Sequence, residues 1–192
     1  MPKKKQGLVI GFDLDGVIID HTQKKILWAA AYGHNLKPEQ TPAEVIEKLL
    51  PPDQLDEIKY LLYSHPEKSL EQPLMPGVQG ALRLLQLKNI PLYLISRRKS
   101  GDLAKELLKI HNLWPRYFNE ANTFFVDGKE DKDIKAKELG ITHYVDDEYP
   151  VLDVLQSVKD RFLFDSCHVW GDLKKYPKIH SWPELIINLN LI

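Results

Sequence analysis

The stretch Leu8-Val9-Ile10-Gly11-Phe12-Asp13-Leu14-Asp15-Gly16 joins an apolar run to two aspartates and a glycine. A continuous apolar run of this length is typical of a strand buried on both faces of a parallel sheet. In open α/β sheets ligands bind beyond the carboxyl ends of the strands, which is where Asp13 and Asp15 are expected. Two neighbouring carboxylates repel each other unless a cation joins them, so the pair predicts a Mg²⁺ site. An ordinary strand-to-turn junction would also use Asp and Gly here.

Strand-like runs recur along the rest of the chain, each separated from the next by a helical pattern: Leu92–Ile95, Thr123–Val126, His143–Val145 and Phe162–Phe164. Helical periodicity is present in Val78–Leu87, where Leu82, Leu84 and Leu85 mark the buried stripe, and in Leu103–Ile110. This alternation predicts an α/β fold with a Rossmann-like parallel sheet of about five strands flanked by helices.

The segment from residue 18 to residue 73 contains helical patterns only. We expect helices over Thr22–Tyr32, Thr41–Leu50 and Asp53–Tyr63, with Thr41 as the N-cap of the second helix and Pro42 at its first position. Prolines at 66, 73 and 76 mark the exit from this segment. The sequence therefore predicts a core formed by residues 1–17 and 74–192, with a small all-helical domain of residues 18–73 inserted after the first strand.

Composition narrows the possible partners and compartment. The net charge of the 192 residues is −1, and Lys3-Lys4-Lys5 is the only basic cluster, so we expect no nucleic-acid partner. No apolar stretch approaches the ~20 residues of a membrane span, and no signal-peptide pattern follows the basic start, so we expect no membrane partner. Cys167 is the only cysteine, which excludes an intrachain disulfide, and the seven histidines have no zinc-type spacing. The expected location is cytoplasmic.

Four short motifs together resemble those of one enzyme family. They are Phe12–Asp20, the strand Ile90–Ile95 ending at Ser96, the helix-like Asp131–Gly140, and Tyr144-Val145-Asp146-Asp147-Glu148. In this order and spacing they resemble the motifs of the haloacid dehalogenase-like (HAD) superfamily of phosphohydrolases. The resemblance spans nearly the whole chain. Residues 18–73 look like the small helical cap of many members, which closes over the substrate and excludes water.

The resemblance implies a role for each residue of the motifs. Asp13 would be the nucleophile that becomes aspartyl-phosphate, and Asp15 the general acid and then the base that activates water. Asp15 would also bind the metal, through its backbone carbonyl. Ser96 would hold the phosphoryl group, Asp146 would bind the metal alongside Asp13, and Asp147 would order a metal-bound water. Dehalogenases of the superfamily lack the second aspartate of the first motif. Because this chain has Asp15 there, its first motif resembles that of the phosphatases.

A cation besides the metal is also implied, because four carboxylates in one pocket would repel an anionic phosphate. The family has a lysine that neutralises the nucleophile and the phosphate oxygens. Lys132 matches best, from its spacing to Leu139-Gly140-Ile141 and Asp146. Lys129 and Lys135 remain alternatives.

Substrate-selecting residues are expected near the motifs and on the cap. Arg97 and Arg98 directly follow Ser96, and either could form a bidentate contact with a second anionic group of the substrate, or a salt bridge within the protein. His21, Lys24 and Trp28 share one helical face near the first hinge and are candidates for substrate selection, although core packing is the more natural role of Trp28.

The resulting hypothesis is a Mg²⁺-dependent phosphomonoesterase acting on a small phosphorylated metabolite. The double aspartate and the stretches Tyr176-Pro177 and Ser181–Leu185 look more like the 5′-nucleotidase branch than the sugar-phosphatase branches. The alternatives are a phosphoglycolate-type or sugar phosphatase, a phosphomutase, or a catalytically silent module that binds a phosphometabolite. The sequence does not indicate an oligomeric state.

Overall fold

A computed structural model of the chain describes residues 7–192, so the basic cluster Lys3-Lys4-Lys5 lies outside the described part. Its centre is a parallel sheet with the strand order β3-β2-β1-β4-β5-β6. The strands are β1 (Ile10–Phe12), β2 (Leu92–Ser96), β3 (Thr123–Phe125), β4 (His143–Asp146), β5 (Asp160–Phe164) and β6 (Lys178–Ile179). The predicted α/β fold is thus confirmed, with six strands instead of five. The additional strand, β6, has two residues and is too short for a periodicity to reveal it.

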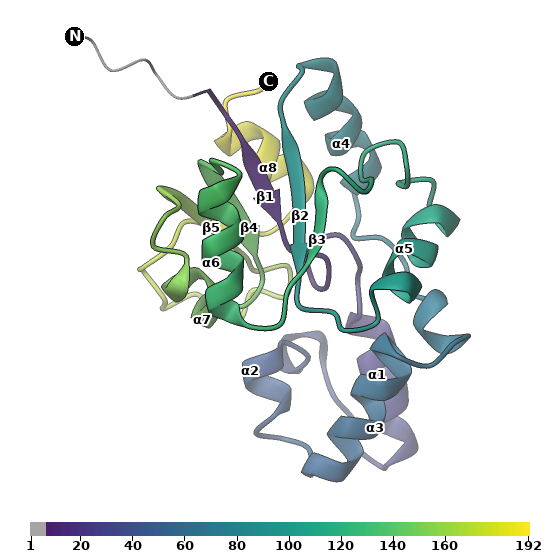
Figure 1. Cartoon of the computed structure of the whole chain (residues 1–192). Helices are drawn as coiled ribbons and strands as arrows, with labels where there is room; N and C mark the ends of the chain where they lie inside the picture. The colour runs from purple at the N-terminus through teal and green to yellow at the C-terminus, as the bar shows by residue number, and fades with distance from the viewer. Residues whose placement is uncertain (1–6) are drawn as a thin grey trace, which may run out of the picture.

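Helices cover both faces of this sheet (Figure 1). The helices α4 (Val78–Leu87), α5 (Gly101–Ile110) and α8 (Trp182–Asn188) contribute to one hydrophobic cluster together with alternate strand residues such as Ile10 and Phe12. The helices α6 (Lys129–Glu138) and α7 (Tyr149–Val154) form a second cluster with the residues that face the other way. None of the helices described between residues 7 and 192 is long and apolar enough to cross a membrane.

The inserted segment forms a separate lobe beyond the carboxyl ends of the strands (Figure 1). Its elements are α1 (Thr22–Ala31), the 3₁₀ turn η1 (Pro38–Gln40), α2 (Ala43–Ile46), α3 (Pro52–Tyr63) and the 3₁₀ turn η2 (Lys68–Leu70). The lobe has a small hydrophobic core of its own, formed by Ala29, Ile46, Leu50, Leu55, Ile58 and Leu62. We call this lobe the cap.

The two chain segments that enter and leave the cap run side by side. Asp20 N–H donates to Pro73 O at 2.8 Å, and Met75 N–H donates to Ile18 O at 2.8 Å. Ile19 and Leu74 also form an antiparallel bridge. A paired linker of this kind holds the cap over the sheet edge.

The second cap helix is shorter than the sequence analysis predicts. Thr41 ends the preceding 3₁₀ turn instead of capping a helix, because its hydroxyl donates to Pro38 O at 2.8 Å. Pro42 therefore becomes the N-cap, and α2 has only four residues. The predictions for α1 and α3 were right to within one residue.

Candidate active site

Three polar side chains meet at the carboxyl ends of the central strands. Asp13 directly follows β1, Ser96 is the last residue of β2, and Asp146 is the last residue of β4. Because β1 pairs with both β2 and β4 in parallel, these three positions lie at the same sheet edge. Asp13 N–H continues the ladder by donating to Val145 O at 3.0 Å. All three side chains are buried.

Lys132 contacts two of these carboxylates from helix α6. Its ammonium lies 2.8 Å from Asp146 Oδ2 and 2.9 Å from Asp13 Oδ1, and its side chain has no exposed surface. Burial alone would lower the pKa of Lys132, but the two carboxylates hold it well above its usual range. Burial, together with Asp146 and Asp15, raises the pKa of Asp13 to about 7 despite Lys132. The lysine therefore only partly offsets the negative charge of this site.

The other two candidate lysines take different positions. Lys129, at the start of α6, lines the cavity described below. Lys135 is paired with Glu138 on the surface of the same helix and lies over the Phe124 ring. The contacts thus favour Lys132, which the sequence ranked first.

Asp13, Asp146 and Asp147 form a group that could hold a metal ion. One oxygen from each carboxylate lies within 4.8 Å of the others. Burial, and after it the neighbouring carboxylates, raise the pKa of Asp147 well above its usual range. Hard oxygen ligands in this number fit Mg²⁺, which is bound by one or two carboxylates and several waters. The Asp15 side chain is not part of this group.

Gly16 is required by the position of Asp147. The backbone of Gly16 has φ +79°, and a Cβ built there would lie 2.0 Å from Asp147 Oδ2. No side chain fits unless the carboxylate moves. The glycine therefore allows the loop after β1 and the loop after β4 to pack together at the candidate metal site.

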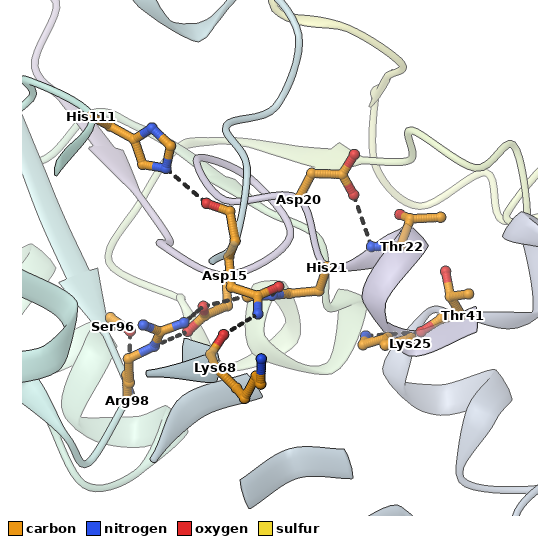
Figure 2. A network of polar contacts seen from close by, with 11 residues as sticks. Asp15, Asp20, His21, Thr22, Lys25, Thr41, Lys68, Ser96, Arg98 and His111 are labelled. Atoms are coloured by element: carbon orange, nitrogen blue, oxygen red, sulfur yellow. Dashed lines mark hydrogen bonds and ion pairs between the residues drawn. The ribbon is translucent and has the colours of Figure 1, made fainter. Parts of the chain in front are cut away.

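Asp15 is held by the side chains of Arg98 and His21 and is not part of the metal group. Arg98 contacts it through two nitrogens, with Nη2 2.6 Å from Oδ1 and Nε 3.2 Å from Oδ2. His21 Nε2 lies 2.7 Å from the same Oδ1. Figure 2 shows the carboxylate between these two side chains. Burial would raise the pKa of Asp15, but Arg98 and His21 outweigh it and hold the pKa well below its usual range.

His21 connects Asp15 to both linkers of the cap (Figure 2). It is the N-cap residue of α1 and contacts Gln72 Oε1 of the second linker through Nδ1 at 3.3 Å. The Gln72 side chain donates to Lys68 O at 2.8 Å, and its backbone carbonyl lies 2.7 Å from His111 Nε2 of the core. The orientation of Asp15 is thereby tied to the position of the cap.

The loop after β2 holds the phosphate-binding candidate Ser96 in place. Arg98 N–H donates to Ser96 Oγ at 3.1 Å, so the hydroxyl proton of Ser96 remains free to donate to a ligand. Arg97 Nη2 lies 2.7 Å from both carboxylate oxygens of Glu148. Both arginines thus have intramolecular partners, which was the alternative that the sequence left open.

A cavity of about 700 Å³ lies between the cap and the core at this edge. Its core wall is formed by Asp13, Asp15, Ser96, Arg97, Arg98, Lys99, Lys129, Glu148 and Pro150, and its cap wall by Ala43, Glu44, Glu47, Asp56, Lys59, Tyr60, Tyr63 and Ser64. The sequence gave no indication of Glu44, whose buried carboxylate accepts no hydrogen bond from another of the described residues. Burial raises the pKa of Glu44 to about 7.

None of the three cap residues predicted to select substrate lines this cavity. Lys24 forms an ion pair with Glu71 at 2.8 Å and lies over the Trp28 ring, which packs on the cap core. Only His21 reaches the site, and it does so through Asp15. Lys24 and Trp28 contact each other on α1, and their other contacts are with Glu71 and with the cap core.

No protein-family model matches the chain, and no curated protein matches it in sequence. The chain is, however, similar to solved structures. A HAD family hydrolase from Deinococcus radiodurans, with bound phosphate and sodium, has a TM-score of 0.65 and 17% identity over 96% of both chains. A HAD hydrolase of family IA, variant 3, from Entamoeba histolytica has a TM-score of 0.63 and 18% identity over 96% of this chain and 99% of its own.

A third similar structure is a predicted phosphoglycolate phosphatase from Haemophilus somnus. Its TM-score is 0.63, with 11% identity over 97% of this chain and 99% of its own.

The chain has the fold of the HAD hydrolases. The match extends over cap and core alike, because at least 96% of this chain is covered in each of these comparisons. Because the sequence identities are only 11–18%, these similarities establish a shared fold and no shared activity. The argument for activity therefore depends on the site residues of this chain.

Proposed function

We propose that the chain is a phosphomonoesterase of the HAD type, which hydrolyses a small phosphorylated metabolite through an aspartyl-phosphate on Asp13. The observation that carries this proposal is the contact of Asp13 with the buried Lys132, at a sheet edge that also holds Ser96 and opens into the cavity. A carboxylate beside a fixed cation and a hydroxyl donor can attack phosphorus while the phosphoryl oxygens are neutralised.

In the first step, an Asp13 oxygen attacks phosphorus and the bond from phosphorus to the ester oxygen breaks. Lys132 and the Ser96 hydroxyl bind the phosphoryl oxygens, and the leaving alkoxide takes a proton from Asp15. That transfer requires a protonated Asp15, whereas its contacts with Arg98 and His21 favour the carboxylate. The acid role therefore requires these contacts to loosen when substrate binds and the cap closes.

In the second step, Asp15 accepts a proton from a water molecule, which attacks phosphorus and releases phosphate and Asp13. The carboxylate form held by Arg98 and His21 suits this step directly. Asp13, Asp146 and Asp147 would hold Mg²⁺, and the ion would neutralise phosphoryl charge when bound. The backbone carbonyl of Asp15 stays a further candidate ligand.

The substrate class remains open to test. The cavity of about 700 Å³ has room for a small metabolite, and its cap wall carries Tyr60 and Tyr63. A 5′-nucleotide is one candidate, suggested only by the double aspartate and the C-terminal stretches named above. A phosphoglycolate-type substrate is another, and one similar structure carries that name. A silent phosphometabolite-binding module is the alternative without chemistry.

The test is release of phosphate from p-nitrophenyl phosphate and from a panel of phosphorylated metabolites. We expect turnover with Mg²⁺, none with EDTA, and inhibition by Ca²⁺, whose larger coordination number engages both oxygens of the nucleophile. Full activity in EDTA would contradict the metal assignment. Binding of metabolites with no turnover of any of them would favour the silent module.

A further inference from the structure

Arg98 carries a hydrogen-bond donor group that has no acceptor in the part of the chain that the structure describes. Its side chain has no exposed surface. A guanidinium has five N–H groups, and the contacts with Asp15 use one on Nε and one on Nη2. Nη1 has no acceptor among residues 7–192. Buried donors without a partner are rare in folded proteins, because each loses its hydration without compensation.

The position of this donor indicates what it could bind. Because Nε and Nη2 form the edge of the planar guanidinium that faces Asp15, Nη1 lies on the far side from that carboxylate. Arg98 lines the cavity beside Asp15 and Ser96, and the Tyr63 ring of the cap lies 5.3 Å from the guanidinium carbon. The proposed reaction places the leaving group next to Asp15, and therefore next to Arg98.

We propose that Arg98 selects phosphate esters whose leaving group carries a carboxylate close to the ester oxygen, that is, phosphorylated short hydroxy acids. Nη1 donates to that carboxylate from the side of the guanidinium opposite to the edge that contacts Asp15. This inference rests on the proposed phosphatase function. One residue would then orient Ser96 through its backbone, position Asp15 through one edge of its guanidinium, and bind the substrate through another.

The charges on the two cavity walls favour binding of the substrate carboxylate at the core wall. The core wall carries four cationic side chains against three carboxylates: Arg97, Arg98, Lys99 and Lys129 against Asp13, Asp15 and Glu148. The cap wall carries one cation against three carboxylates: Lys59 against Glu44, Glu47 and Asp56. Arg97 is the competing candidate, because it also lines the cavity and its buried Nε has no partner among the described residues. However, the Arg97 side chain is 31% exposed, and both oxygens of Glu148 already contact its Nη2.

The experiment compares 2-phosphoglycolate, which carries the carboxylate, with its carboxamide analogue and with propyl phosphate. Wild-type protein, Arg98→Lys and Arg97→Lys are measured with Mg²⁺. We expect wild type to prefer 2-phosphoglycolate in kcat/KM by roughly tenfold or more, the usual size of a hydrogen bond to a charged group. Arg98→Lys keeps the charge but lacks Nη1 and should lose this preference. Arg97→Lys should retain it.

The ratio between substrates separates recognition from positioning. A disturbed Asp15 slows all three esters together, whereas loss of Nη1 affects only the ester that carries a carboxylate. Equal wild-type kcat/KM for the three esters would overturn the inference without any variant. A preference that survives in Arg98→Lys, or disappears in Arg97→Lys, would also overturn it.

Affinities measured by calorimetry test the inference even if the protein turns over no substrate. If no ester is hydrolysed, p-nitrophenyl phosphate included, the proposed function fails. The affinities of wild type, Arg98→Lys and Arg98→Gln for 2-phosphoglycolate and propyl phosphate then still decide the role of Arg98. Tighter binding of 2-phosphoglycolate that disappears in both Arg98 variants supports it, and equal affinities contradict it.

Discussion

The Lys132 ammonium lies 2.9 Å from Asp13 Oδ1, and this contact links helix α6 to the end of the central strand β1. The lysine side chain is fully buried, and it also contacts Asp146. Removal of one partner from a buried ionic group leaves an uncompensated charge, which costs far more than the loss of a surface pair. Lys132 is therefore both a stabilising residue and the candidate partner of the phosphate.

We predict that Lys132→Met lowers the free energy of unfolding by about 3–5 kcal/mol in EDTA. The cause is the repulsion that remains between Asp13 and Asp146. Mg²⁺ should restore part of this loss, since it binds the same carboxylates. Urea unfolding with and without Mg²⁺ measures both effects. Lys135→Met is the matched control on the same helix, and its partly exposed pair should be worth less than about 1 kcal/mol.

A loss in Lys132→Met no larger than in Lys135→Met would show that the buried contact is not stabilising.

The sequence predicted the strand ends well because each depends on a local pattern. Asp13, Ser96 and Asp146 all follow apolar runs, and in a parallel sheet such runs end at the same edge. Lys132 was ranked first by the family resemblance, from its spacing to Asp146, and its ammonium contacts Asp13 and Asp146. The cap was predicted as helical, but the length of its second helix was not, since the bond from Thr41 to Pro38 competes with helix formation.

The contacts that could not be predicted join residues far apart in the chain. Arg98 and Asp15 are 83 positions apart, and no periodicity indicates which cation meets which carboxylate. Glu44 looks in the sequence like an ordinary acidic residue in the first turn of a helix. Its burial results from the cap packing over the core, which depends on tertiary structure alone.

Asp13→Asn should abolish turnover while the protein stays folded. An amide is close to a carboxylate in size but is a far poorer nucleophile. Because burial raises the pKa of Asp13 to about 7, the ionised side chain destabilises the folded state at pH 8, and the variant should have an equal or higher Tm there. Phosphate release and thermal unfolding in EDTA measure the two effects. More than a few per cent of wild-type turnover would exclude Asp13 as the nucleophile.

Gly16→Ala should reduce both stability and Mg²⁺ affinity. The added Cβ would meet Asp147 Oδ2 at 2.0 Å, and the positive φ of residue 16 adds strain. Gly80→Ala is the matched control, because Gly80 lies within α4 and a Cβ there meets nothing within 4 Å. It should raise stability by about 0.5–1 kcal/mol. Thermal unfolding and Mg²⁺ titration test the pair, and equal Mg²⁺ affinity in both variants would contradict the role of Gly16.

Glu44→Gln should stabilise the protein at alkaline pH but not at acidic pH. Burial raises the pKa of Glu44 from 4.5 to about 7, so the folded state binds its proton more tightly than the unfolded state does. The stability that this proton contributes is fully present below about pH 4.5 and is lost as the pH rises through about 7. The Tm difference between Glu44→Gln and wild type in EDTA should therefore grow from pH 5 to pH 8. Glu47→Gln is the control for the loss of a charge, because Glu47 is exposed and forms an ion pair with the exposed Lys59.

A Tm difference that stays constant from pH 5 to pH 8 would show that the pKa of Glu44 is not raised in the folded state.

Asp15→Asn should slow alkyl phosphates more than aryl phosphates if Asp15 is the general acid. General acid catalysis contributes ~10²–10⁴-fold, and it matters most when the leaving oxygen is strongly basic. The contacts of Asp15 with Arg98 and His21 favour its carboxylate, which makes a role as base only the specific alternative. In that case the variant would form the aspartyl-phosphate from both esters at the wild-type rate, and it would release one equivalent of p-nitrophenol or of propanol in a burst and then stall. If Asp15 is the general acid, the burst of p-nitrophenol remains and only the burst of propanol is slowed. Pre-steady-state kinetics with p-nitrophenyl and propyl phosphate, on wild type and Asp15→Asn, distinguishes the two roles.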